Sequence, residues 1–150
     1  MADTYDLQRF VAAQDAAGTY ESAVAELGDG RKRSHWMWFV FPQIAGLGQS
    51  PTSRRYAIRS LDEARAYLEH PVLGPRLRES TRIVAELTGR TAEEIFGGID
   101  AVKLRSSMTL FARAAADNGL FTRVLDAYFD GRADPATDRL LADTNPRAEG

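Results

Sequence analysis

The chain contains no cysteine and only two histidines, at positions 35 and 70. Without cysteine there can be no disulfide, no thiol catalysis and no thiolate metal site, and two histidines far apart in sequence argue against a histidine-rich zinc site. We therefore expect no bound metal. A cysteine-free chain also fits a reducing compartment, and we predict a cytoplasmic location.

Long apolar runs are absent as well. No stretch approaches the roughly 18 apolar residues of a membrane span, and Met1 leads directly into the polar ADTYD rather than a secretory signal, so we expect no membrane association. With 44% hydrophobic and 27% charged residues the composition is that of a globular protein, and 150 residues suit one core. We predict one domain over 1–143 and a flexible tail over 144–150.

Acidic residues are missing between Asp29 and Asp62. Six basic residues give that segment a charge of +6 and leave −8 for the other residues: Arg31, Lys32, Arg33, Arg54, Arg55 and Arg59. If these charges also gather in space, they would attract phosphate, carboxylate or nucleic acid. The alternative is that they lie on solvated helix ends. A sequence pI near 5.7 argues against broad nucleic-acid binding.

Apolar residues recur with helical spacing along most of the chain. The longest predicted helices cover 6–17, 72–87, 101–116 and 120–129, and Leu104, Met108 and Phe111 share one apolar face of the third. Nothing marks a domain boundary or a repeat. The prediction is an all-α fold, an irregular single-domain bundle of about seven or eight helices.

Several polar residues mark where helices begin. Ser60 with Glu63, and Thr91 with Glu94, have the spacing of capping boxes. Asp100 is predicted to cap the helix over 101–116.

Segment 34–43, SHWMWFVFPQ, contains both tryptophans and one of the histidines. Its aromatic residues favour a strand, whereas Ser34 as N-cap and Pro42 as stop favour a helix buried on every side. We choose the short buried helix because the flanking segments are helical.

The next segment, PQIAGLGQSPTS over 42–53, is predicted to be a long loop because of its glycines and prolines. It has neither the third glycine of a dinucleotide fingerprint nor the Gly-Lys-Ser/Thr of a P-loop, so no cofactor is predicted. Its amides could still form an anion-binding nest, although we favour a plain connecting loop.

Four blocks of the chain, DLQRFVAAQ, RKRSHWMWFVFPQIAGLGQSPTSRRYAI, EHPVLGPRL and KLRSSMTLF, resemble the small bacterial family called domain of unknown function 1810. Relatives are sometimes labelled calpastatin. The resemblance extends over about residues 5–141. It implies a single-domain, all-helical cytosolic protein and no established reaction.

His35 is the candidate catalytic residue. An imidazole beside the basic run can act as a general acid or base or bind an anion, although it can also simply cap a helix start. Trp38 can stack on a ring, or serve only as a core residue.

The remaining candidates are predicted to contact a ligand: Arg33, Gln43, Tyr56, Lys103, Arg105 and Ser107. Lys103 and Ser107 share a helix face, which suggests a polar groove. Serine hydroxyls inside helices often bond only the carbonyl one turn back, and that reading stays open. No Gly-x-Ser-x-Gly elbow is present, so a serine hydrolase is not supported, and whether the protein is an enzyme stays undecided.

Three functions remain. The first is a pocket between the SHWMWF segment and the KLRSSM helix that binds a small phosphorylated or nucleotide-like ligand, and we favour it. The second is a non-catalytic scaffold for a protein partner. The third is a nucleic-acid-binding domain that uses the basic segment 31–59.

Overall fold

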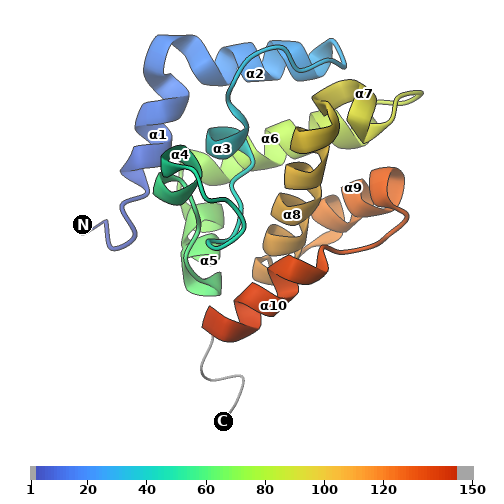
Figure 1. Ribbon diagram of the computed structural model, residues 1–150. Coiled ribbons are helices and arrows are strands. Elements are labelled where there is room, and N and C mark those ends of the chain that lie inside the picture. The colour runs from blue at the N-terminus through green and yellow to red at the C-terminus, as the bar shows by residue number, and fades with distance from the viewer. Residues whose placement is uncertain (1–2, 145–150) are drawn as a thin grey trace.

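The computed structural model describes residues 3–144, which form ten α-helices and one 3₁₀ helix (Figure 1). The all-α prediction is confirmed. The predicted count of seven or eight is too low. Three helices have only four or five residues, α3 (Met37–Val40), α4 (Pro51–Arg55) and α7 (Ala92–Phe96), and α4 lies partly in a segment predicted to be a loop. Most of the predicted tail, 145–150, lies outside the described residues.

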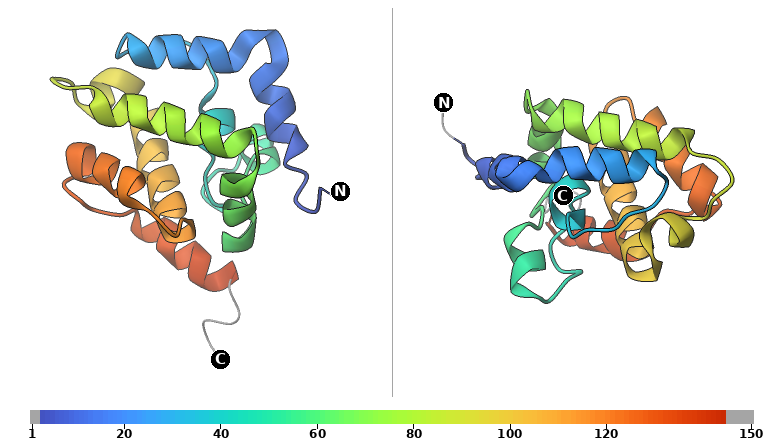
Figure 2. Two further views of the ribbon diagram at one scale, coloured as in Figure 1. Left: turned by 180° about the vertical axis from the view of Figure 1, so that it is seen from behind. Right: turned by 90° about the horizontal axis from the view of Figure 1, so that it is seen from above.

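The longer helices pack around α8 (Gly98–Ala114), which stands near the centre of Figure 1. It contacts α5 (Leu61–Glu69), α7, α9 (Gly119–Phe129) and α10 (Pro135–Thr144). A second layer is formed by α6 (Leu73–Glu86) and α2 (Thr19–Gly28), which lie side by side in both views of Figure 2. The chain enters this layer through α1 (Gln8–Asp15) and the 3₁₀ helix η1 (Ala16–Gly18). Within residues 3–144, none of the helices has the length and apolarity that a bilayer crossing requires.

The centre of the core is the predicted apolar face of α8. Leu104, Met108 and Phe111 are all fully buried. Phe111 continues into a row of rings, since its centroid lies 5.4 Å from that of Tyr67 and 6.0 Å from that of Phe121. The periodicity that predicted this helix therefore also identified its buried side.

The predicted start of α7 is confirmed, whereas the predicted cap of α8 is wrong. Thr91 and Glu94 form the complete capping box at α7. Asp100 does not cap α8, because Gly97, with φ of 83°, is the N-cap and lets the chain turn sharply from α7. Asp100 therefore lies in the first turn of the helix, where its carboxylate is free to contact side chains.

Segment 34–43 is less helical than predicted. Only the single turn of α3 forms, with Trp36 rather than Ser34 at its N-cap. Ser34 lies outside the helix because both its amide and its hydroxyl donate hydrogen bonds to the carboxylate of Glu26 on α2. Those two contacts replace the hydrogen bonds that a longer helix would have supplied.

The predicted loop over 42–53 ends in a helix. Ser50 caps α4 by accepting a hydrogen bond from the amide of Ser53 at 3.1 Å, and Pro51 occupies the first helical position. This Ser-Pro start signal is present in the sequence. The other end of the loop is held by Ile58, whose amide donates to the carbonyl of Gln43 at 2.8 Å in an isolated bridge between 44 and 58.

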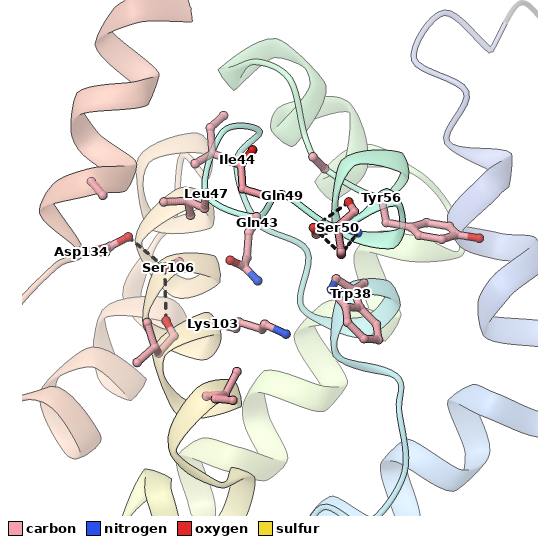
Figure 3. A pocket seen from close by; sticks show the side chains of 16 residues that line it. Trp38, Gln43, Ile44, Leu47, Gln49, Ser50, Tyr56, Lys103, Ser106 and Asp134 are labelled. Carbon is pink, nitrogen blue, oxygen red and sulfur yellow. Dashed lines mark hydrogen bonds between the residues drawn. The ribbon is translucent and has the colours of Figure 1, made fainter.

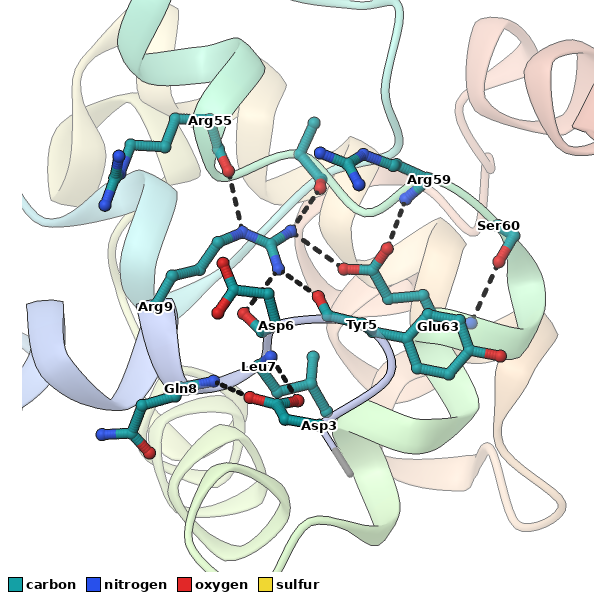
Figure 4. Close-up of polar contacts among 11 residues, drawn as sticks. Asp3, Tyr5, Asp6, Leu7, Gln8, Arg9, Arg55, Arg59, Ser60 and Glu63 are labelled. Atoms are coloured by element: carbon teal, nitrogen blue, oxygen red, sulfur yellow. Dashed lines mark hydrogen bonds and ion pairs between the residues drawn. The ribbon is translucent and has the colours of Figure 1, made fainter. Parts of the chain in front are cut away.

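Arg9 and Glu63 form a buried ion pair beneath this loop (Figure 4), with an Nη2 to Oε2 distance of 2.9 Å and side chains only 5% and 1% exposed. The Arg9 guanidinium also donates to four backbone carbonyls, those of Tyr5, Asp6, Arg55 and Ala57. The Glu63 carboxylate accepts a hydrogen bond from the amide of Arg59 at 3.0 Å. It is therefore not used for the capping box that the sequence predicted between Ser60 and Glu63. The Arg9 side chain thus joins residues 5–6, the end of the loop and α5.

Replacement of Glu63 with Ala should lower the free energy of unfolding by about 3 kcal/mol or more, because the Arg9 charge stays buried without its carboxylate. The exposed neighbour Asp62, which pairs with Arg65 at 3.4 Å, is the matched control, and Asp62→Ala should cost less than about 1 kcal/mol. Urea unfolding of both variants measures the difference. Equal losses would show that the buried pair adds nothing beyond a surface carboxylate.

Candidate functional site

A cavity of about 610 Å³ lies between the 43–57 segment, the first half of α8 and the start of α10 (Figure 3). We call it the loop cavity. Its polar side chains come from residues 38–57, from α8 and from the start of α10. They are Trp38, Gln43, Gln49, Ser50, Ser53, Tyr56, Lys103, Ser106 and Asp134. In Figure 3 the side chains of Gln43 and Lys103 point into the space between α8 and Trp38. The site therefore requires that the loop and α8 come together.

The apolar lining of the loop cavity includes two exposed side chains. Ile44 and Leu47 come from the loop, and Ile99 and Val102 from the first turns of α8. Ile99 and Val102 are 77% and 65% exposed and are the exposed large hydrophobic side chains within residues 3–144. Isolated exposed apolar residues need no explanation, but two together at a cavity mouth form an apolar lip that a bound molecule would cover.

A smaller hollow of about 340 Å³ adjoins the loop cavity and shares Trp38, Ile99 and Lys103 with it. Lys32, His35 and Asp100 also line this space, which we call the lysine hollow. The shared residues show that the two spaces meet at the indole of Trp38 and the side chain of Lys103.

Lys32 and Lys103 are the two lysines of a chain that otherwise uses arginine. Both contact one carboxylate, that of Asp100, with Nζ to oxygen distances of 2.9 Å from Lys32 and 3.4 Å from Lys103. The Lys103 ammonium also lies 4.6 Å from the ring centroid of Trp38, within cation–π range. Two ammonium groups and one carboxylate leave a net charge of +1 at the junction of the two spaces.

Glu26 fixes the position of the segment that carries His35 and Trp38. Its carboxylate accepts hydrogen bonds from the amide of Arg33 at 2.7 Å and from the indole of Trp36 at 2.9 Å, besides the two from Ser34. Burial by itself would raise the pKa of Glu26. The hydrogen bonds outweigh burial and lower this pKa to about 2, so the group is charged at neutral pH.

The structure brings together four of the predicted ligand-binding residues, Trp38, Gln43, Tyr56 and Lys103, in the wall of the loop cavity. His35 is exposed and lines the adjoining lysine hollow.

Three other candidates lie outside both spaces. Arg33 is exposed and pairs with Asp29 at 3.1 Å. Arg105 donates to the carbonyls of residues 132 and 133, which anchors the connection into α10. Ser107 is fully buried, and its hydroxyl has no hydrogen-bond partner within residues 3–144.

Ser106, rather than Ser107, accompanies Lys103 in the cavity wall. Its hydroxyl donates to Asp134 at 2.8 Å, and the same carboxylate oxygen accepts from the hydroxyl of Thr137 at 2.6 Å at the start of α10. The carboxylate thus orders the helix start and contacts the serine directly, without an intervening imidazole. This arrangement suits binding better than nucleophilic attack by the serine.

Sequence reasoning did not assign Asp100 or Asp134 to the ligand site, and it counted Lys32 only as part of the basic segment. The rarity of lysine was a usable signal for Lys32, since only two lysines occur in the chain. The approach of Ser106 to Asp134 is a contact across 28 positions and has no local signature. Within the described part of the chain, no group of three or more histidine or acidic side chains is placed to hold a metal ion.

The model of a family described as protein of unknown function (DUF1810) matches residues 4–141. Among solved structures, the chain is similar to the conserved hypothetical protein Rv1873 from Mycobacterium tuberculosis, with 57% sequence identity and a TM-score of 0.90. The match covers 93% of this chain and 99% of that one. Among curated proteins, none matches the chain.

Because its pKa is lowered, Glu26 should stabilise the folded protein at neutral pH and lose this effect in acid. Because the folded-state pKa of about 2 lies below the ordinary value of 4.5, the stabilisation is complete above about pH 4.5 and disappears as the pH falls toward 2. The stability advantage of the wild type over Glu26→Gln should therefore shrink by an amount on the order of 3 kcal/mol between pH 6 and pH 2. Chemical denaturation at several pH values measures it.

Glu21→Gln is the matched control, because Glu21 lies on the same helix, is exposed and accepts no hydrogen bond within the described residues. An equal pH dependence of the Glu21 and Glu26 differences would contradict the anchoring role.

Proposed function

The chain belongs to the DUF1810 family of proteins of unknown function, and we propose that it binds a small anionic, nucleotide-like ligand between the SHWMWF segment and the KLRSSM helix. The ligand's ring system would occupy the loop cavity and its phosphate the lysine hollow. The observation that carries the proposal is the meeting of both lysines of the chain at Asp100 in the lysine hollow, where Lys103 also lines the loop cavity.

The contacts of Lys103 make it the principal phosphate ligand. Its 3.4 Å contact with Asp100 is longer than the 2.9 Å contact of Lys32, and its side chain is 23% exposed against 7% for Lys32. A phosphate can thus approach Lys103 while Lys32 continues to hold Asp100. An ammonium group is a compact point charge that suits phosphate.

The loop cavity supports the other half of the ligand. Trp38 presents an aromatic ring at the junction, and the exposed Ile99 and Val102 add apolar surface to the lining of the loop cavity. The side-chain amide of Gln43 can hydrogen-bond to the edge of a heterocycle, whereas the hydroxyl of Tyr56 points away from the cavity (Figure 3). A volume of about 610 Å³ lies within the range of roughly 300 to 1,000 Å³ that is usual for small-molecule sites.

His35 is assigned to the anionic end of the ligand. It lines the lysine hollow beside Lys32, so its imidazole can donate to a phosphate oxygen when protonated. Any acid–base step on the bound molecule would use this side chain.

A scaffold function is the second candidate, and the apolar lip of Ile99 and Val102 favours it. In that case a partner protein, rather than a small molecule, would cover the lip, and substitution of Lys103 would have little effect on binding.

Calorimetric titration with adenosine monophosphate, at about 0.15 M salt, tests the proposal. Lys103→Met keeps much of the apolar stem and removes the charge, so it should weaken binding roughly 10- to 100-fold, as expected for a charge-assisted hydrogen bond worth about 1.5 to 3 kcal/mol. Arg123→Ala, an exposed cation on α9, is the control and should bind like the wild type.

Equal affinity of the two variants would overturn the assignment of Lys103. If no purine or pyrimidine monophosphate binds at millimolar concentration, the nucleotide-like class itself is wrong.

A further inference from the structure

A third space, of about 740 Å³, opens between α5, α6, the end of α8 and the start of α9, and it shares no lining residue with the two spaces above. The rear view of Figure 2 looks onto these helices. Four arginines from three helices line it: Arg65, Arg78, Arg82 and Arg113. We call it the arginine cavity.

The charge of this cavity is opposite to that of the whole protein. Its lining contains two carboxylates, Glu69 and Asp117, against the four guanidinium groups, which leaves +2 on a chain whose net charge is −2. By comparison, the loop cavity is lined by one cation, Lys103, and one carboxylate, Asp134. Of these three spaces, the arginine cavity therefore has the most positive lining, and its arginines lie outside the basic segment 31–59.

Two of the four arginines already have carboxylate partners. Arg113 binds Asp138 through two hydrogen bonds of 2.9 and 3.0 Å, and Arg65 reaches Asp62 at 3.4 Å. The former is a bidentate pair, whereas the latter is a long contact between exposed side chains. Arg65 can therefore turn toward an anion at little cost.

Arg78 and Arg82 lack such partners. Arg78 donates to the carbonyl of Leu68 at 3.2 Å, which satisfies an N–H group but neutralises no charge. The side chain of Arg82 has neither a hydrogen-bond nor an ion-pair partner within residues 3–144. The two are four positions apart on α6, so they share one helix face, where like charges destabilise a helix unless an anion lies between them.

We infer that the arginine cavity is a second anion-binding site, which takes a multiply charged phosphate through Arg78 and Arg82, with Arg65 as a third contact. Guanidinium groups bind phosphate oxygens in pairs, and groups that approach from α5 and α6 suit an anion with several charged oxygens. Leu68 and Phe121, both buried, supply an apolar floor that strengthens these contacts by excluding water.

Titration of inorganic pyrophosphate into the full-length protein at about 0.15 M salt tests the inference. Arg82→Ala removes an exposed side chain without an internal partner, so it should fold normally and weaken pyrophosphate binding at least tenfold. Arg123→Ala should change the affinity less than twofold, since Arg123 lies outside the cavity. Arg82→Ala should weaken pyrophosphate binding more than Lys103→Met does, which separates this site from the one proposed above.

The inference is overturned if pyrophosphate does not bind at millimolar concentration, or if Arg82→Ala binds it like the wild type. Loss of binding in Lys103→Met alone would place the anion in the lysine hollow. The melting temperature without anion is a second readout. Arg82→Ala should be as stable as the wild type or more stable at low salt, because it relieves repulsion with Arg78, and a clear loss of stability would assign Arg82 a structural role instead.

Discussion

The ion pair between Arg9 and Glu63 is the contact on which the loop side of the molecule depends. Burial of two charges is costly, and it is tolerated here because the guanidinium also binds four carbonyl oxygens and the carboxylate also accepts from the amide of Arg59. Two of those carbonyls belong to Arg55 and Ala57, on either side of Tyr56. The pair thereby sets the path of the backbone that leads to the bridge at Ile58, and it positions both Tyr56 and Gln43 in the cavity wall.

A second buried carboxylate performs the same task for the neighbouring segment. Glu26 accepts three hydrogen bonds from residues 33 and 34 and one from the indole of Trp36. Both glutamates lie on regular helices and bind backbone that is not helical. Irregular segments can thus be held firmly at the site, because each carboxylate satisfies amides that secondary structure leaves unpaired.

The two types of cation in this chain are distributed differently. Its two lysines meet at Asp100, beside Trp38 and an apolar lip, where a point charge and a ring face lie close together. Several of its arginines instead anchor loops, as Arg9 and Arg105 do, or line the arginine cavity. Arg31 and Arg33, which belong to the basic segment 31–59, are exposed and line none of the three spaces.

Sequence alone determined those features that depend on near neighbours along the chain. The helical spacing of Leu104, Met108 and Phe111 identified the core face of α8, and Thr91 with Glu94 marked the start of α7. Trp38, Gln43, Tyr56 and Lys103 were selected by residue type, and these four do line one cavity. Tertiary structure decided the rest, because the partners are distant in sequence. Glu26 shortened the helix expected at Ser34, Asp134 paired with Ser106, and the packing of α5, α6, α8 and α9 formed the arginine cavity. Periodicity and capping report which face of a helix is buried, whereas only the packing of helices against one another determines which polar groups meet.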